Sequence, residues 1–203
     1  MIEGVDTEAA LDATMIVVRR EFASVPTIAA ANAMSPGLID EMMTEMRPLM
    51  RDYQERVRVL YRPRMIAILA DGLTPAEASD VAAFYRSELG RRILGGVSRN
   101  FSPDATLDSV SELEEDEDFE ATREDVETDL LNASAASMQE LRDEDFATLA
   151  RLAAEKPALL KLNAIMPQIV SMRAEMENEQ TTSEEDARLQ SAIEGVFERR
   201  LGE

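Results

Sequence analysis

Apolar residues recur at three- and four-residue steps along most of this chain, which is the spacing of one buried face of an α-helix. No stretch shows a convincing alternation of β-branched and polar residues, the period of two that indicates a half-buried strand. The pattern therefore predicts an all-α bundle of about seven to nine helices. The longest run of apolar positions is Ile39, Met42, Met46, Leu49, Met50, Tyr53, Val57, Leu60 and Tyr61.

Prolines and capping residues set the predicted limits of these helices. A proline removes a backbone donor and crowds the preceding turn, so we expect Pro26 to end the first helix. For the same reason Pro48 and Pro63 are expected to kink or split the longest one. Ser183 precedes three acidic residues and is expected to cap the last helix. The predicted helices cover residues 7–24, 27–34, 36–61, 64–70, 74–94, 119–139, 141–156, 157–179 and 183–200.

The stretch from Leu73 to Phe101 has the clearest local pattern in the chain. The Thr74 hydroxyl can accept a bond from the first helical turn, and Glu77 can reach back to the cap as in a capping box. Pro75 fits the first helical position, where no backbone donor is needed. Ser87 is placed to cap a second helical segment. The stretch therefore predicts two short helices in succession.

The glycines in the same stretch are expected to affect helix packing and helix length. Gly90 leaves room for a close approach between helices. Gly95 and Gly96 are adjacent, and the pair is expected to loosen or end the second helix because glycine is a poor helix former.

These residues resemble the DUF2059 domain family of bacterial proteins. The resemblance lies within residues 73–101, and Glu88 stands where the family typically has proline. It implies an all-helical protein of the bacterial cell envelope, usually exported, without an established biochemical function and without defined functional residues. The matching residues are Leu73, Thr74, Glu77, Ala83, Phe84, Tyr85, Ser87 and Gly90.

A second stretch, residues 141–162, resembles residues 73–94 at an offset of 68. In both, a leucine precedes an acidic helix start, an apolar face follows and a break comes near the middle. We therefore predict an internal duplication. The halves would be residues 1–101 and 119–203, joined by an acidic linker over 102–118, unless the whole chain forms one compact domain. The aligned pairs are Leu73 with Leu141, Glu77 with Asp145, Val81 with Leu149, Ala82 with Ala150, Phe84 with Leu152 and Leu94 with Leu162.

Charge is abundant and unevenly placed. The formal net charge is −20, which argues against non-specific binding to nucleic acid and against electrostatic binding to anionic membranes. Residues 104–145 hold seventeen acidic residues and two arginines, a net of −15. Residues 47–99 hold ten arginines and six acidic residues, a net of +4. The basic segment could face the acidic one, within one chain or between two; otherwise both are solvated helix surfaces.

The residue types available argue against catalysis. The chain has no Cys and no His, which removes the commonest metal ligands and the commonest general base. It also lacks a nucleophile elbow, a glycine-rich phosphate loop and a metalloprotease helix. The acidic run 112–118 has oxygen ligands for a hard cation, but it lacks a glycine and the spacing of a calcium loop. We predict that the protein is not an enzyme and has no catalytic, metal-binding or cofactor-binding residues.

Two groups of residues are candidates for contact with a ligand or partner. The first is Phe84, Tyr85, Arg86 and Arg91. The aromatic pair also suits core packing, and the arginines also suit pairing with the acidic segment. The second is a set of methionines that could line an adaptable groove or belong to a plain core. These are Met42, Met43, Met46 and Met50.

The function that we predict is non-catalytic: an envelope protein that acts through contacts with a protein partner or with a second copy of itself. The alternative is a binding module for a small apolar or lipid-like ligand held between the halves, and a third reading is an unrecognised hydrolase. The sequence shows no integral membrane span and no signal peptide. Since the family resemblance implies export, we expect a periplasmic or secreted mature form whose leader has been removed.

Overall fold

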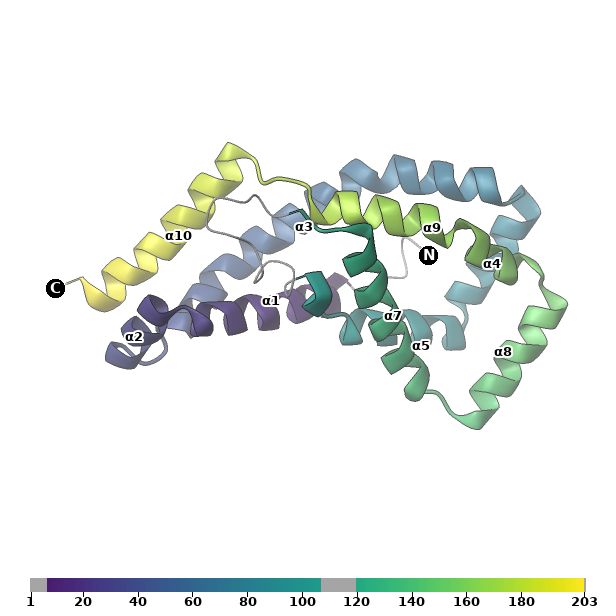
Figure 1. Cartoon of the computed structure of the whole chain (residues 1–203), viewed down its shortest axis with the longest axis horizontal. Coiled ribbons are helices and arrows are strands. Elements are labelled where there is room, and N and C mark those ends of the chain that lie inside the picture. Colours follow the sequence, from purple (N-terminus) through teal and green to yellow (C-terminus); the bar gives the residue numbers. More distant parts are fainter. Residues whose placement is uncertain (1–6, 107–119, 203) are drawn as a thin grey trace. The chain divides into compact units, whose positions relative to one another are not determined.

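The computed structural model describes residues 7–106 and 120–202, and that part of the chain contains helices and no strand (Figure 1). The all-α prediction is confirmed. The predicted linker over 102–118 and its acidic run lie largely outside the described residues. The helices are α1 (Thr7–Ser24), α2 (Pro26–Met34), α3 (Leu38–Gly72), α4 (Pro75–Arg86), α5 (Glu88–Asn100), α7 (Arg123–Gln139), α8 (Asp143–Glu155), α9 (Ala158–Glu177) and α10 (Ser183–Leu201).

Threonine capping boxes begin three of these helices. At α4 the Thr74 hydroxyl accepts the Glu77 N–H, and the Glu77 carboxylate accepts the Thr74 N–H, as predicted. Thr122 plays the same part at α7, which therefore begins at Arg123, later than the predicted start near residue 119. Thr182, and not Ser183, caps α10. Since each box satisfies donors that the helix itself leaves unpaired, these starts are encoded locally.

The helix splits predicted at Pro48 and Pro63 and the helix end predicted at Gly95 and Gly96 are wrong, whereas a kink or a loosened turn at these positions stays a prediction. α3 runs through Pro48 and Pro63 without interruption, and α5 runs through Gly95 and Gly96 to Asn100. An interior proline costs a helix about 3 kcal/mol, which tertiary packing can outweigh. In α3 buried side chains lie on both sides of each proline and hold the helix in place: Met42, Met46, Val57 and Ile68.

The chain divides into two compact units, and these differ from the predicted halves 1–101 and 119–203. One unit contains residues 59–178 together with the N-terminal residues up to Ala10. The other contains Leu11–Arg58 and Glu179–Glu203. The difference arises because α10, at the end of the chain, packs against α1 and the first part of α3 rather than against α9.

Two apolar clusters hold α1, α2, the first part of α3 and α10 together. In one of them Val196 of α10 and Leu38 of α3 are fully buried. In the other, Leu11 and Met15 of α1 meet Met46 of α3. The methionine set named above belongs to these clusters: Met42 and Met46 are buried, and Met43 and Met50 pack against them. These methionines are therefore core residues and do not line an open groove.

The core of the unit formed by residues 59–178 lies between the end of α3, α4 and α9, which run close together in Figure 1. Ile165 and Met172 of α9 are buried against Ile68 of α3 and Val81 of α4. The Tyr61 hydroxyl donates to the Glu175 carbonyl oxygen at 3.1 Å. Apolar contact is thus supplemented by a polar tie between α3 and α9.

α5 and α7 approach each other closely in the same unit. Gly96 is buried, and a Cβ atom there would overlap the Ser137 hydroxyl oxygen. That hydroxyl donates to the Ile93 carbonyl oxygen at 3.0 Å. A buried polar group thus has its partner, and the missing side chain of Gly96 makes the contact possible.

Asp129 is a buried carboxylate that holds the chain after α5. Its side chain on α7 is 1% exposed. It accepts the N–H groups of Ala105 and Thr106 at 2.8 and 3.3 Å, and the Thr106 hydroxyl at 2.7 Å. These donors begin the helical turn at residues 104–106, so Asp129 caps that turn from another helix.

The predicted duplication stays a prediction, although the helix limits agree with its alignment. α4 begins at Pro75 and α8 at Asp143, which is the offset of 68 residues. Leu73 and Leu141, just before the two starts, are both buried. A cap other than threonine, Arg142, precedes α8.

We expect Gly96→Ala to lower the free energy of unfolding by about 1–3 kcal/mol, because its methyl group would force α5 away from Ser137. Gly95→Ala is the matched control. A Cβ there meets only the flexible end of the Arg99 side chain at 3.1 Å. Because alanine has the higher helix propensity, this variant should raise the free energy of unfolding by up to about 1 kcal/mol. Urea unfolding followed by circular dichroism measures both. Equal effects from the two alanines would contradict the close α5–α7 contact.

Asp129→Ala should lower the free energy of unfolding by about 2–3 kcal/mol, because it removes the acceptor of three donors, two of them on the buried Thr106. Glu127→Ala, at an exposed position on the same helix, should change stability by less than about 0.5 kcal/mol. The same unfolding measurement compares them, and an Asp129 variant as stable as the Glu127 variant would contradict the capping role.

Candidate functional site

The predicted aromatic pair lies at the junction of α4 and α5. The Phe84 and Tyr85 rings meet edge to face, with centroids 5.0 Å apart. Tyr85 packs against the core formed by α3, α4 and α9, and burial raises the pKa of its phenol. A Cβ atom at Gly90 would overlap the Phe84 carbonyl oxygen, so the glycine allows the turn between the helices. These contacts are a sufficient structural explanation for the two aromatic residues at this junction.

Arg86 and Arg91, the other predicted contact residues, lie on the surface. Both are exposed, and within residues 7–106 and 120–202 neither forms an ion pair. The neighbouring Arg92 does pair, with Asp145 of α8 at 2.8 Å and with Glu88 at 2.9 Å. The basic segment thus meets the acidic one within the chain at Arg92, and again where Arg99 pairs with Glu140 at 3.0 Å. The contact role of Arg86 and Arg91 stays a prediction.

Both lysines of the chain pair with carboxylates of α4. Lys161 pairs with Glu77, and Lys156 at the end of α8 pairs with Asp80. The Lys161 ammonium, together with the Thr74 N–H and hydroxyl, lowers the pKa of Glu77 to about 2. The capping glutamate of α4 is therefore also its tie to α9.

An equivalent group joins α3 to α10. Arg56 donates to the Glu185 carboxylate at 2.9 Å and to Glu179 at 3.3 Å. The Arg56 guanidinium, followed by the Thr182 N–H, lowers the pKa of Glu185 to about 2. As at α4, the glutamate of a capping box also carries a contact between helices.

The electrostatics of these carboxyl groups are those of structural ion pairs. Where a carboxyl group of the described residues has a clearly shifted pKa, the pKa is lowered by a basic side chain or a backbone N–H, and at Glu140 first by the Asn100 amide and then by Arg99. A general acid near neutral pH needs the opposite shift. The groups concerned are Glu41, Glu55, Glu77, Glu140, Asp145 and Glu185.

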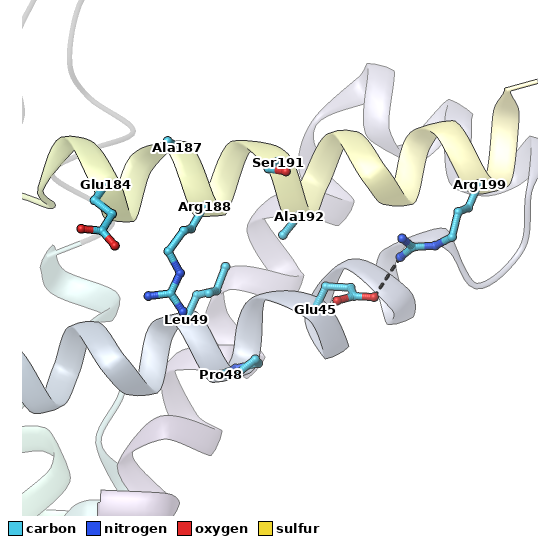
Figure 2. Close-up of a pocket in the computed structure, with 9 residues that line it drawn as sticks. All are labelled: Glu45, Pro48, Leu49, Glu184, Ala187, Arg188, Ser191, Ala192 and Arg199. Atoms are coloured by element: carbon cyan, nitrogen blue, oxygen red, sulfur yellow. Dashed lines mark hydrogen bonds and ion pairs between the residues drawn. The ribbon is translucent and has the colours of Figure 1, made fainter.

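An open groove of about 600 Å³ lies between α3 and α10 (Figure 2). Pro48 and Leu49 of α3 face small side chains of α10, such as Ala192. Arg199 pairs with Glu45 at 2.9 Å across the groove, as the dashed line in Figure 2 shows. This ion pair, and that of Arg188 with Asp52 of α3 at 3.0 Å, hold α10 on α3. The lining residues are Glu45, Pro48, Leu49, Glu184, Ala187, Arg188, Ser191, Ala192 and Arg199.

A more distinctive surface lies on the last part of α3. Six apolar residues there are exposed, including Val59 at 56%, Leu60 at 54% and Ile66 at 51%. At 100° per residue the six fall within an arc of about 120°, free of charged residues. We call them the outer face of α3: Val59, Leu60, Pro63, Ile66, Ala67 and Ala70.

The opposite side of the same helix segment is also apolar, and it is packed. Ile68 is buried against α9, and Tyr61, Met65 and Leu69 pack around it. A helix that is apolar on all sides is normally covered on all sides. The outer face of α3 is therefore the surface whose exposure most needs an explanation.

Sequence reasoning missed this surface for an identifiable reason. The apolar run was assigned to a single buried face that included both Leu60 and Tyr61. The structure separates them: Tyr61 packs on the core, whereas Leu60 is exposed. A signal was present, because residues 59–70 contain only Arg62 and Arg64 as charged residues and are otherwise almost wholly apolar.

Residues 62–95 match the sequence model of a family described as "Uncharacterized protein conserved in bacteria (DUF2059)", which confirms the resemblance. The match covers the end of α3, α4 and the first part of α5. Comparisons with curated proteins and with solved structures gave no match. In the described part of the chain, none of the helices has the length and apolar character needed to cross a membrane.

The pKa of Glu77 has a consequence for acid stability. It lies below the value of 4.5 of a free glutamate, so the contribution of this group is fully present above pH 4.5 and is lost as the pH falls towards 2. Glu77→Gln keeps a side chain that can cap but removes the charge. We therefore expect this variant to be less stable than the wild type at pH 6, with the difference shrinking towards pH 2.

Thermal unfolding at a series of pH values measures this difference, with Glu127→Gln as an exposed control on another helix. A constant difference between the Glu77 variant and the wild type over this range would contradict the ion pair with Lys161.

Proposed function

We propose that this protein is a non-catalytic helical protein of the bacterial cell envelope, periplasmic or secreted, that acts through protein–protein contacts made by the outer face of α3. The observation that carries the proposal is the exposure of Val59, Leu60 and Ile66 on a helix whose other side is already packed. Contiguous exposed apolar surface is typical of interaction sites in water-soluble domains.

The place of this face in the chain supports the proposal. Four of its six residues, from Pro63 to Ala70, lie within the segment that matches the bacterial family. The segment is held in place by the capping box of α4, by the ion pair of Glu77 with Lys161 of α9 and by the apolar core around Ile68. The outer face thus lies on a helix that is already held in place. A partner helix can pack its own apolar side against such a face.

The chemistry of the charged groups supports a non-catalytic role. The carboxyl groups with shifted pKa values are held in ion pairs with their pKa lowered, as at Glu77 and Glu185. The assignment to the envelope rests on the family resemblance, which implies export.

Photo-cross-linking in cells tests this function. We expect p-benzoylphenylalanine at position 67, within the outer face, to give an adduct heavier by the mass of a protein chain. The same group at Ile16, a 69% exposed residue of α1, should give none. Adding Ile66→Glu to the position-67 chain should abolish the adduct, since a charge would then have to be buried in the contact.

Two results would contradict the proposal. An adduct with the mass of a lipid, or no adduct at all, would argue against protein contacts at this face. Recovery of the full-length product and its adduct from the cytoplasm, and not from the periplasm or medium, would argue against the envelope assignment.

A further inference from the structure

The outer face of α3 has its large and small side chains at opposite ends. Val59 and Leu60 form the end nearer the N-terminus, whereas Ala67 and Ala70 form the other. Ile66 and Pro63 lie between them. Such a face is complementary in shape to a copy of itself turned end for end, because the large residues of each copy then meet the small residues of the other.

We propose that the occupant of this face is a second copy of the chain, with the two α3 helices packed antiparallel about a two-fold axis between Pro63 and Ile66. The inference rests on the proposed function and names its partner. In this arrangement Leu60 packs on Ala67 of the second copy and Val59 packs on Ala70 of the second copy. The two Ile66 side chains meet near the axis.

The antiparallel register follows from distances along the helix. At a rise of 1.5 Å per residue, positions 59 and 70 are about 16 Å apart. A parallel pair would place Leu60 against Leu60 at one end and leave a gap between the alanines at the other, and unfilled apolar volume is destabilising. The antiparallel pair fills both ends equally.

The charge of the whole chain disfavours contact with an anionic membrane. The chain as a whole has a net charge of −20, which repels an anionic bilayer. Residues 47–99, which hold the outer face, have a local net charge of +4, so two copies would meet through segments that carry far less charge than the chain as a whole. Antiparallel helix dipoles attract each other. The contact involves about three turns of one helix per copy, at the small end of specific interfaces, so the dimer is weak and forms with rising concentration.

Cysteine cross-linking tests both the partner and the register, since the chain has no cysteine of its own. Ile66→Cys should form a disulfide with itself, because the two positions lie close to the axis. Neither Val59→Cys nor Ala70→Cys alone should cross-link under the same mild oxidation, because a disulfide requires Cα atoms within about 7 Å. An equimolar mixture of the two should give the mixed disulfide dimer.

Ile16→Cys is the control for chance collisions, since this residue is exposed and lies outside the face. Circular dichroism of each reduced variant verifies that the helices are intact. Self-linking by Val59→Cys as fast as by Ile66→Cys would overturn the antiparallel register. Linking by Ile16→Cys at the same rate as by Ile66→Cys would overturn the dimer contact.

The outcome also separates this inference from the proposed function. If no disulfide dimer forms but position 67 captures a different protein in cells, the second copy is overturned and the protein-contact function stands. If neither product forms, both are overturned. Flotation of the wild-type chain, but not of Ile66→Glu, with vesicles of phosphatidylethanolamine and phosphatidylglycerol would replace the second copy by a membrane surface.

Discussion

The last part of α3 is apolar on two opposite sides, and both the core of residues 59–178 and the proposed contact depend on this property. One side is covered by α9, where Ile68 is buried beside Ile165 and Met172. The other side, with Leu60 and Ile66, has no cover from the described residues. Burial of apolar surface is the main favourable contribution to folding and association, so the same helix can serve both. One side organises the unit of residues 59–178, and the other remains for a partner.

Several charged residues of the described part of the chain hold helices to one another. Glu77 and Glu185 each close a capping box and then accept a basic side chain from a second helix. Such surface pairs contribute modestly at neutral pH, and they orient helices that have few aromatic side chains to interlock. At these contacts the acidic residues therefore have a structural role.

Local signals in the sequence were sufficient for the helices but not for their assembly. Thr74 and Ser87 act as caps, as predicted, because a cap depends on residues a few positions away. Pro48 and Gly96 do not break their helices, because packing from residues distant in the sequence outweighs the local preference. One compact unit joins Leu11–Arg58 to Glu179–Glu203, which contains α10, and no local pattern in the sequence indicates this pairing.

The candidate surface, too, was decided by packing between residues that are distant in the sequence. Phe84 and Tyr85 stood out as aromatic residues in a chain that has few, yet their contacts place them at the α4–α5 junction and on the core. The outer face of α3 consists of ordinary aliphatic residues, and periodicity alone could not tell which of two apolar sides the fold would cover. Only the position of α9 decides that Tyr61 is packed and Leu60 is not.

Hydroxyl-radical footprinting of the full-length wild-type chain over a range of concentrations can show whether a second copy covers the outer face of α3. We expect Leu60 and Ile66 to be labelled readily in dilute protein and to become protected as the concentration rises, while Ile16 and Leu131, which are also exposed, stay equally labelled throughout. Protection of Leu60 and Ile66 already at the lowest concentration would mean that the chain covers this face itself. Unchanged labelling at every concentration would mean that a second copy does not cover it.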